Sequence, residues 1–239
     1  MSSRFLKLRK IARYITREMH PRWLRLAACV TASTFLAPAC LRVAAAELSV
    51  TVTSSSGGAI SGALVVAEPA QPAPRPAVAQ HGIMDQRNLQ FVPDLLVVRT
   101  GALVEFPNSD QVRHQVYSFS GAKSFQLPLY AGHTQPPIAF DKPGLVTIGC
   151  NIHDNMIGFI YVSDTPWYGR TAADGTLKIR DMPPGEYTVR VWHPLIDETG
   201  PQLEQHISVA ELGSVSFRLK QALRQPLMHH GADKKWEDY

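Results

Sequence analysis

The chain has 239 residues, of which 45% are hydrophobic and 18% are charged, and its formal net charge is +4. This length allows one large domain or two small ones. Residues 1–46 hold nine of the 24 basic residues and one of the 20 acidic residues, so 15 basic and 19 acidic residues remain after them, a net charge of −4. The basic character therefore belongs to the leader, and the rest of the chain gives no reason to expect nucleic-acid binding.

Residues 1–46 have the pattern of an export signal. Arg22 and Arg25 precede the apolar run LAACVTASTFLAPA, and Ala44-Ala45-Ala46 offers a small-residue cleavage site. The sequence therefore predicts a periplasmic mature protein that starts near Glu47. Met19 is an alternative start that would give a signal of more ordinary length. No later segment approaches 18 consecutive apolar residues, so we expect no membrane span in the mature chain.

The three cysteines bear on two questions, namely whether the protein has a lipid anchor and whether it has a metal-binding thiol. A lipid anchor at Cys40 is not favoured, because Ala37 stands where a bulky aliphatic residue is usual. Cys29 and Cys40 leave with the signal, so Cys150 remains as a single thiol in an exported protein. It is either a buried inert cysteine or a thiolate that binds a metal.

After the signal, short apolar runs are broken by Gly, Pro, Asn and Asp about every ten residues, which predicts an all-β chain. We expect Tyr117, Phe119 and Phe125 to be core residues. The predicted strands are 48–53, 63–67, 89–92, 95–99, 102–106, 114–119, 138–141, 145–150, 157–162, 177–180, 187–192, 203–209 and 215–219.

The pattern favours two β-sandwiches. The dipeptide Asp174-Gly175 predicts a hairpin turn, and PPGEYTVRVW predicts a turn followed by an alternating strand. The expected segments are the signal at 1–46, N-terminal strands and a Pro/Ala-rich connector at 47–83, one domain at 84–164, a second small sandwich at 165–220, and a flexible tail at 221–239.

One group of residues points to a metal. Cys150, His153 and Met156 have the spacing C-x2-H-x2-M in a predicted loop between two strands, and His114 lies on a predicted strand upstream. A thiolate, two imidazoles and a weak thioether form the ligand set of a blue-copper electron-transfer site. Soft sulfur stabilises Cu(I), whereas imidazole suits both oxidation states.

The same residues allow other interpretations. A lone His on a strand or a lone Met near a strand usually has a structural role. Zinc is a possible occupant, but Met is a poor zinc ligand. A c-type haem is excluded because its C-x-x-C-H attachment motif is missing. His193 and His206 have no second ligand at metal spacing, and His229-His230 are expected in a solvated tail.

The stretches FVPDLLVVRTGALVEFPNSDQVRHQV (91–116) and GLVTIGCNIHDNM (144–156) resemble the cupredoxin family, and the ligand loop is similar to that of amicyanin. HQVYSFSGAKSFQLPLYAG and CNIHDNMIGFIYVSDTP resemble plastocyanin-like exported proteins called methylamine utilization proteins. The resemblance implies a cupredoxin-like Greek-key β-sandwich that holds one type 1 copper ion with His114, Cys150, His153 and Met156. It also implies that His153 is the exit for the electron.

Three positions depart from the family pattern. Gln115 follows the first His where Asn is common, and Ile152 stands where Pro is frequent before the second His. Both changes can alter the hydrogen bonds around the sulfur. Asp154 adds a negative charge beside His153, where many relatives are apolar.

A second resemblance covers GRTAADGTLKIRDMPPGEYTVRVWHP (169–194), which is similar to the second half of a carboxypeptidase-regulatory-like, or transthyretin-like, sandwich. LSVTVTSSSGGAISGALVVAEP (48–69) fits the first half. One hypothesis is that these stretches, including residues 47–67, pack together with the copper domain inserted between them. In the alternative, residues 48–67 supply the first strands of the copper domain.

The expected function is therefore electron transfer between a redox donor and a redox acceptor through transient encounters. The alternative is a copper-holding or partner-binding module without redox shuttling. We do not expect an enzyme, because the chain has none of the His-x-His or His-Cys-His arrangements of multicopper oxidases and nitrite reductases.

Overall fold

The computed structural model describes residues 45–72, 80–132, 135–196 and 203–224. Three predicted segments lie wholly or partly outside the described residues: 1–44 of the export signal, 73–79 of the connector, and 225–239 of the tail, which include His229-His230. The all-β prediction is confirmed, because every regular element among the described residues is a strand. None of these residues forms a helix with the length and hydropathy needed to cross a membrane.

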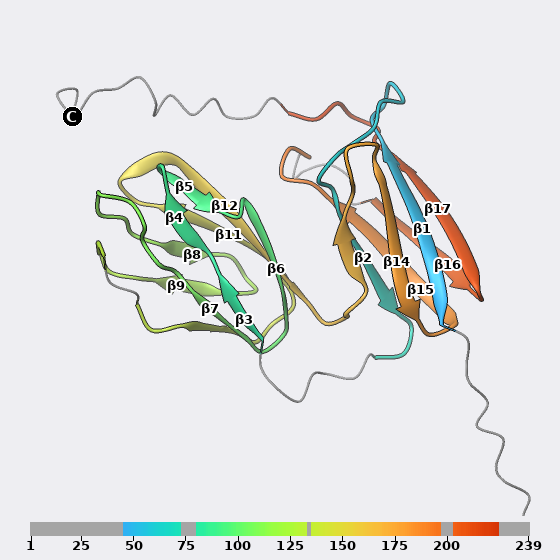
Figure 1. Cartoon of the computed structure of the whole chain (residues 1–239), viewed down its shortest axis with the longest axis horizontal. Helices are drawn as coiled ribbons and strands as arrows, with labels where there is room; N and C mark the ends of the chain where they lie inside the picture. Colours follow the sequence, from blue (N-terminus) through green and yellow to red (C-terminus); the bar gives the residue numbers. More distant parts are fainter. Residues whose placement is uncertain (1–44, 73–79, 133–134, 197–202, 225–239) are drawn as a thin grey trace, which may run out of the picture. The chain divides into compact units, whose positions relative to one another are not determined.

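Two sheets and one hairpin form a central sandwich (Figure 1). The sheets have the orders β6-β12-β11-β8-β9 and β10-β7-β3, and β4 pairs with β5. The strand bounds are β3 His81–Ile83, β4 Asp85–Arg87, β5 Gln90–Val92, β6 Leu95–Arg99, β7 Ala102–Glu105, β8 Tyr117–Phe119, β9 Ser124–Gln126, β10 Ile138–Phe140, β11 Gly144–Cys150 and β12 His153–Ser163.

The core of the central sandwich contains large side chains from both of its sheets. Phe106, Phe140, Ile148 and Ile160 are almost completely buried and belong to one cluster. Each such side chain contributes about 1.5–3 kcal/mol through removal of apolar surface from water. The same cluster includes Cys150, so one of the predicted ligands extends from a packed core.

The other strands form a terminal sandwich, in which β1 lies between β14 and β17 (Figure 1) and β2 lies between β13 and β15. Strand β1 pairs antiparallel with β14 and parallel with β17, and β2 pairs antiparallel with β13 and β15. The bounds are β1 Ala46–Thr53, β2 Leu64–Pro69, β13 Tyr168–Arg170, β14 Thr176–Met182, β15 Gly185–Trp192, β16 Leu203–Val209 and β17 Leu212–Arg218. The two strands that precede the central sandwich thus share sheets with strands that follow it.

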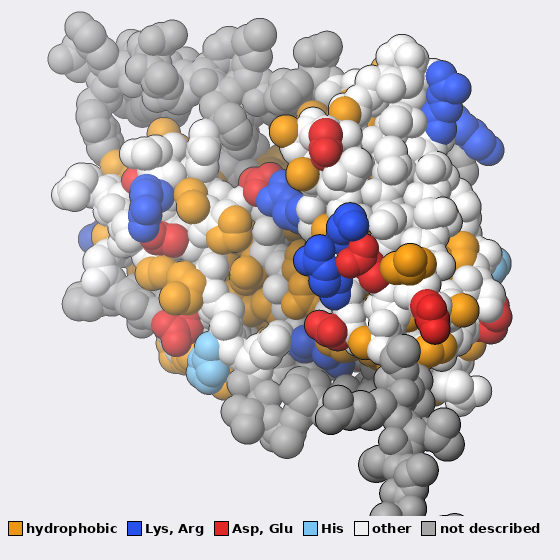
Figure 2. Space-filling view, turned by 45° about the vertical axis from the view of Figure 1, so that its right-hand side comes forward, with side chains coloured by type: hydrophobic (Ala, Val, Ile, Leu, Met, Phe, Trp, Pro, Cys, Tyr) orange, Lys and Arg blue, Asp and Glu red, His pale blue; other side chains and the backbone are white. Residues whose placement is uncertain are grey.

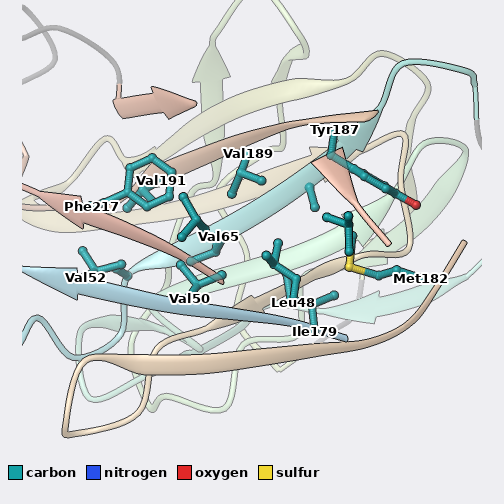
Figure 3. Packing of buried hydrophobic residues seen from close by; sticks show 14 of the residues in the cluster. Leu48, Val50, Val52, Val65, Ile179, Met182, Tyr187, Val189, Val191 and Phe217 are labelled. Atoms are coloured by element: carbon teal, nitrogen blue, oxygen red, sulfur yellow. The ribbon is translucent and has the colours of Figure 1, made fainter. Parts of the chain in front are cut away.

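Apolar alternation explains why the terminal sandwich closes. Leu48, Val50 and Val52 of β1 alternate with more exposed residues, and all three belong to the buried cluster. They pack with Val189 and Val191 of β15, as Figure 3 shows. Two sheets with one apolar face each therefore bury those faces against each other.

The strand predictions for 95–99 and 203–209 agree with β6 and β16 at both ends. Four three-residue strands, β3, β4, β9 and β13, were not predicted, because HGI, DQR, SFQ and YGR show no apolar alternation. The Asp174-Gly175 turn is present, with Gly175 at φ +76° and its amide bonded to the Ala172 carbonyl. The expected hairpin was wrong, because β13 and β14 on either side of the turn belong to different sheets.

The expectation of three core aromatic residues was wrong for Phe119, which is 79% exposed at the end of β8. Phe125 does pack against the central core, whereas Tyr117 is half-buried.

On the face shown in Figure 2, acidic and basic side chains are interspersed among the described residues. The described part of that face therefore has no large patch of only positive or only negative charge.

Candidate metal centre

Strand alternation places the Cys150 side chain inside the central sandwich. Val146, Ile148 and Cys150 are the buried residues of β11, with more exposed residues between them. Because side chains on a strand point alternately to the two faces, Cys150 continues the inward row. Its side chain lies at the end of the core, and Cys150 is a free cysteine.

The predicted ligand loop proved to be much shorter than expected. Strand β11 runs through Cys150 and β12 begins at His153, so only Asn151 and Ile152 form the turn. Cys150 pairs with His153 across this turn, as expected for a two-residue hairpin. The strand ladder therefore fixes the backbones of both predicted ligands.

A bulge follows the turn. Gly149 pairs with Ile157, whereas its neighbour Cys150 pairs with His153, so residues 154–156 are additional on the β12 side. Such extra residues change where the following side chains point. Met156 is 1% exposed and shares the buried cluster of Cys150.

His114 comes from a different segment, and its predicted strand was partly wrong. Strand β8 begins only at Tyr117, and His114 instead forms an isolated bridge with Tyr130. The amide of each residue donates to the carbonyl of the other at 3.0 Å. Asn108 anchors the same bridge, because its Nδ2 donates to the Tyr130 carbonyl at 3.0 Å.

Three predicted ligands converge. Nδ1 of His114 and Nδ1 of His153 lie 3.1 Å apart, and Sγ of Cys150 lies 3.7 Å and 3.5 Å from them. Together they form a group of potential metal ligands within 4.8 Å of one another. The fourth predicted residue, Met156, is placed in the same core cluster as Cys150.

The donor triangle has the size that one metal ion requires. Bonds of about 2.0 Å to nitrogen and about 2.3 Å to sulfur separate the donors of a trigonal site by roughly 3.5–3.7 Å. The observed separations of 3.1, 3.5 and 3.7 Å are close to these values. A soft thiolate with two imidazoles suits copper, and it also suits zinc.

The sulfur has its own hydrogen-bond donors. Burial raises the pKa of the Cys150 thiol, but hydrogen bonds from His114 and from the backbone amides of Gln115 and Ile152 outweigh burial and leave the pKa below its ordinary value. The two amides belong to the positions that depart from the cupredoxin pattern. Because the backbone makes these contacts, Ile152 supplies one that a proline at this position, which has no amide N–H, could not make. The Gln115 side chain instead donates to the Leu127 carbonyl.

The two imidazoles differ in their surroundings. Burial lowers the pKa of His114, but hydrogen bonds with Cys150 and Asp110 overcome burial and raise the pKa above its ordinary value. Burial lowers the pKa of His153, and the neighbouring His114 lowers it further. A proton in this pair is therefore held by His114 rather than by His153.

Asp110 belongs to this site and was missed from the sequence. Its Oδ2 lies 2.8 Å from Nε2 of His114, on the side of the ring away from Cys150. Burial raises the pKa of Asp110, but bonds from the Leu89 amide, His114 and the Asn88 amide leave that pKa below its usual range. The four-residue spacing between Asp110 and His114 could have indicated their contact. The contacts of Asp110 with residues 88 and 89 join segments about 20 residues apart, so no local pattern predicts them.

Some solved structures are similar to part of this chain. No family model matches the chain. No curated protein matches it either. Among solved structures, the chain is similar to a copper-containing nitrite reductase from Thermus scotoductus, with 29% identity and a TM-score of 0.33 over 39% of this chain and 25% of the reductase.

Two smaller proteins are also similar. A reduced Cu(I) form of an amicyanin variant shows 19% identity and a TM-score of 0.33, over 41% of this chain and 98% of amicyanin. A purple cupredoxin from Nitrosopumilus maritimus shows 23% identity and a TM-score of 0.31, over 35% of this chain and 99% of its own.

Proposed function

We propose that this chain is an exported, non-enzymatic blue-copper electron-transfer protein that works in the periplasm. One observation carries the proposal: Nδ1 of His114, Sγ of Cys150 and Nδ1 of His153 converge to within 4.8 Å of one another. These residues would hold one copper ion, with Met156 as the weak fourth ligand. Bound copper would supply one-electron chemistry between Cu(I) and Cu(II).

The residues of the chain would keep that site rigid. The two-residue turn fixes Cys150 relative to His153, and the Tyr130 bridge fixes His114. Amides of Gln115 and Ile152 support the thiolate. A frame that holds the same donors in place for both oxidation states reduces the rearrangement that accompanies each electron transfer.

The partners in this proposal are a redox donor and a redox acceptor that bind transiently. Ile152 lies beside His153 and is 47% exposed, so an apolar side chain lies next to the half-buried imidazole. The export signal predicted from the sequence of residues 1–46 supports the periplasmic location.

The test is a visible and EPR spectrum of residues 47–239 after addition of one equivalent of Cu(II). We expect an intense thiolate-to-copper charge-transfer band and a narrow copper hyperfine splitting, both lost in Cys150→Ser. Reversible reduction and reoxidation of the band would support electron transfer. A colourless protein with an ordinary Cu(II) signal would overturn the blue-copper assignment and favour a copper-holding module.

A further inference from the structure

The turn between β4 and β5 has an unusual backbone. Asn88 and Leu89 both have positive φ, 54° and 59°. A two-residue hairpin turn of type I′ needs positive φ at both positions, and Asn followed by Gly is preferred there. Asn88 fits this preference, but a bulky residue such as Leu89 rarely adopts a left-handed conformation. Other contacts must therefore hold the turn in this shape.

Those contacts come from a single carboxylate. The Asn88 amide donates to Oδ1 of Asp110 at 2.5 Å, and the Leu89 amide donates to Oδ2 at 2.9 Å. Successive backbone amides in such a turn form a concave site for an anion. The turn therefore binds the Asp110 carboxylate through its backbone.

The same carboxylate reaches the candidate metal centre. Oδ2 of Asp110 lies 2.8 Å from Nε2 of His114, whose side chain is fully buried. When Nε2 carries the proton and donates to Asp110, the lone pair of the ring lies on Nδ1. That atom faces Cys150 and His153.

The loop that carries Asp110 is itself anchored. The Asp110 amide donates to Oδ1 of Asn108 at 2.9 Å, and Nδ2 of Asn108 donates to the Val112 carbonyl at 2.9 Å. The Ser109 amide donates to the carbonyl of Gln86, on β4, at 3.0 Å. The loop is thus tied to the strand that enters the turn, and both sides of the Asp110 contact have fixed backbones.

We propose that the Asn88-Leu89 turn is a positioning element for the metal centre. Through Asp110 it keeps the proton on Nε2 of His114, sets the ring orientation and presents Nδ1 to the ion. Asn88, Leu89 and Asp110 are positioning residues, because none of them is a proposed ligand. The inference rests on the proposed metal site, but it concerns contacts within the chain that can be measured without copper.

The first test is NMR of the imidazole nitrogens in the metal-free protein at mildly alkaline pH, where His114 is neutral. We expect the wild type to carry the His114 proton on Nε2, with slow exchange. Asp110→Ala should give a mixture of tautomers with fast exchange. Asp154→Asn removes a charge beside His153 and should leave the tautomer unchanged. A single Nε2–H tautomer in Asp110→Ala would overturn the proposal.

The second test measures hydrogen exchange of the Asn88 and Leu89 amides, with and without one equivalent of Zn(II) as a diamagnetic probe. Because coupling between two sites is reciprocal, Zn(II) should slow exchange at both amides roughly tenfold in the wild type. The slowing should vanish in Asp110→Ala and persist in Leu89→Gly, which keeps the amide and tolerates positive φ. Equal slowing in wild type and Asp110→Ala would contradict the proposal.

The third test measures the affinity of the variants for Zn(II). Loss of a hydrogen-bond partner of a ligand typically weakens metal binding roughly 10- to 100-fold, and we expect this loss for Zn(II) in Asp110→Ala but not in Asp154→Asn. If Asp110→Ala does not fold, Asp110→Leu gives the same readouts with a side chain of similar size that cannot accept a hydrogen bond. A wild type that is colourless with Cu(II) but keeps the tautomer and the exchange coupling would overturn the proposed function and leave the positioning role standing.

Discussion

Nδ1 of His114 lies 3.1 Å from Nδ1 of His153. Because Nε2 of His114 faces the Asp110 carboxylate, Nδ1 of neutral His114 presents a lone pair toward the second imidazole. Two lone pairs at this distance would repel, so a proton or a metal ion must lie between the two nitrogens. A proton on Nδ1 of His153 can lie between the rings in the metal-free protein, and a metal ion would replace this hydrogen bond with a bond to each nitrogen.

Metal loading should therefore stabilise the fold. We expect Zn(II) at about one hundred times its dissociation constant to add about 2.7 kcal/mol to the free energy of unfolding, measured as a rise in the midpoint of thermal unfolding. His153→Ala should lose most of this rise, because it removes one donor of the triangle. His206→Ala removes an exposed histidine outside the site, so this variant should keep the rise in the unfolding midpoint. An equal rise in both variants would place the bound ion elsewhere.

Met156→Leu should retain copper with a changed reduction potential. The thioether is the weak ligand of the proposed set, so the two imidazoles and the thiolate would still hold the ion. Met156 is 1% exposed, and a swap between Met and Leu in a core usually costs less than about 1.5 kcal/mol. Voltammetry and copper analysis of both proteins provide the measurement. Complete loss of copper would show that Met156 does more than a weak ligand can.

The local part of the site was predictable from the sequence. Cys150 follows an apolar alternating run, so both its strand and its inward direction could be inferred. The close spacing of Cys150 and His153 predicts that the two residues lie near each other, and they pair across the turn. His114 was a candidate because of its chemistry and the resemblance, and the structure brings it to the other two.

The remaining features depend on contacts that no local pattern encodes. The bulge that follows His153 depends on pairing with β11, and the Tyr130 bridge joins residues 16 positions apart in a segment without alternation. Asp110 acts through amides of residues 88 and 89, whose backbone conformation is favoured for Gly rather than for Leu. The 79% exposure of Phe119 shows that aromatic character alone did not predict burial.

Asn108→Ala should destabilise the central sandwich. The residue is 8% exposed, and its side chain donates to the carbonyls of Val112 and Tyr130 and accepts from the Asp110 amide. Its removal takes this partner from the partly buried Val112 carbonyl and Asp110 amide, at about 1 kcal/mol for each lost hydrogen bond, whereas the Tyr130 carbonyl keeps the His114 amide. Denaturant unfolding of the metal-free protein measures the change. Gln126→Ala, at an exposed position on β9, should change stability by less than about 0.5 kcal/mol. Similar losses in both variants would contradict the argument.

His193 should give the terminal sandwich a pH-dependent stability. The residue follows β15 and is 9% exposed, and its Nδ1 accepts the Leu195 amide at 3.1 Å. Burial lowers the pKa of His193, and a hydrogen bond with the Ser61 backbone offsets this only in part. Protonation of Nδ1 would also remove the bond from Leu195, so the folded state favours the neutral ring.

The sign of the effect follows from proton binding. The unfolded chain takes up a proton on His193 near its ordinary pKa of about 6.5, whereas the folded chain does so only at lower pH. Between these two values the unfolded state binds more protons, so the free energy of unfolding falls as the pH falls, by at most about 1.4 kcal/mol per pH unit for one group. His193→Gln should flatten this limb of the curve, and His206→Gln should leave it unchanged. Denaturant unfolding of the metal-free protein from neutral to mildly acidic pH measures the slope, and an identical slope in wild type and His193→Gln would show that another group is responsible.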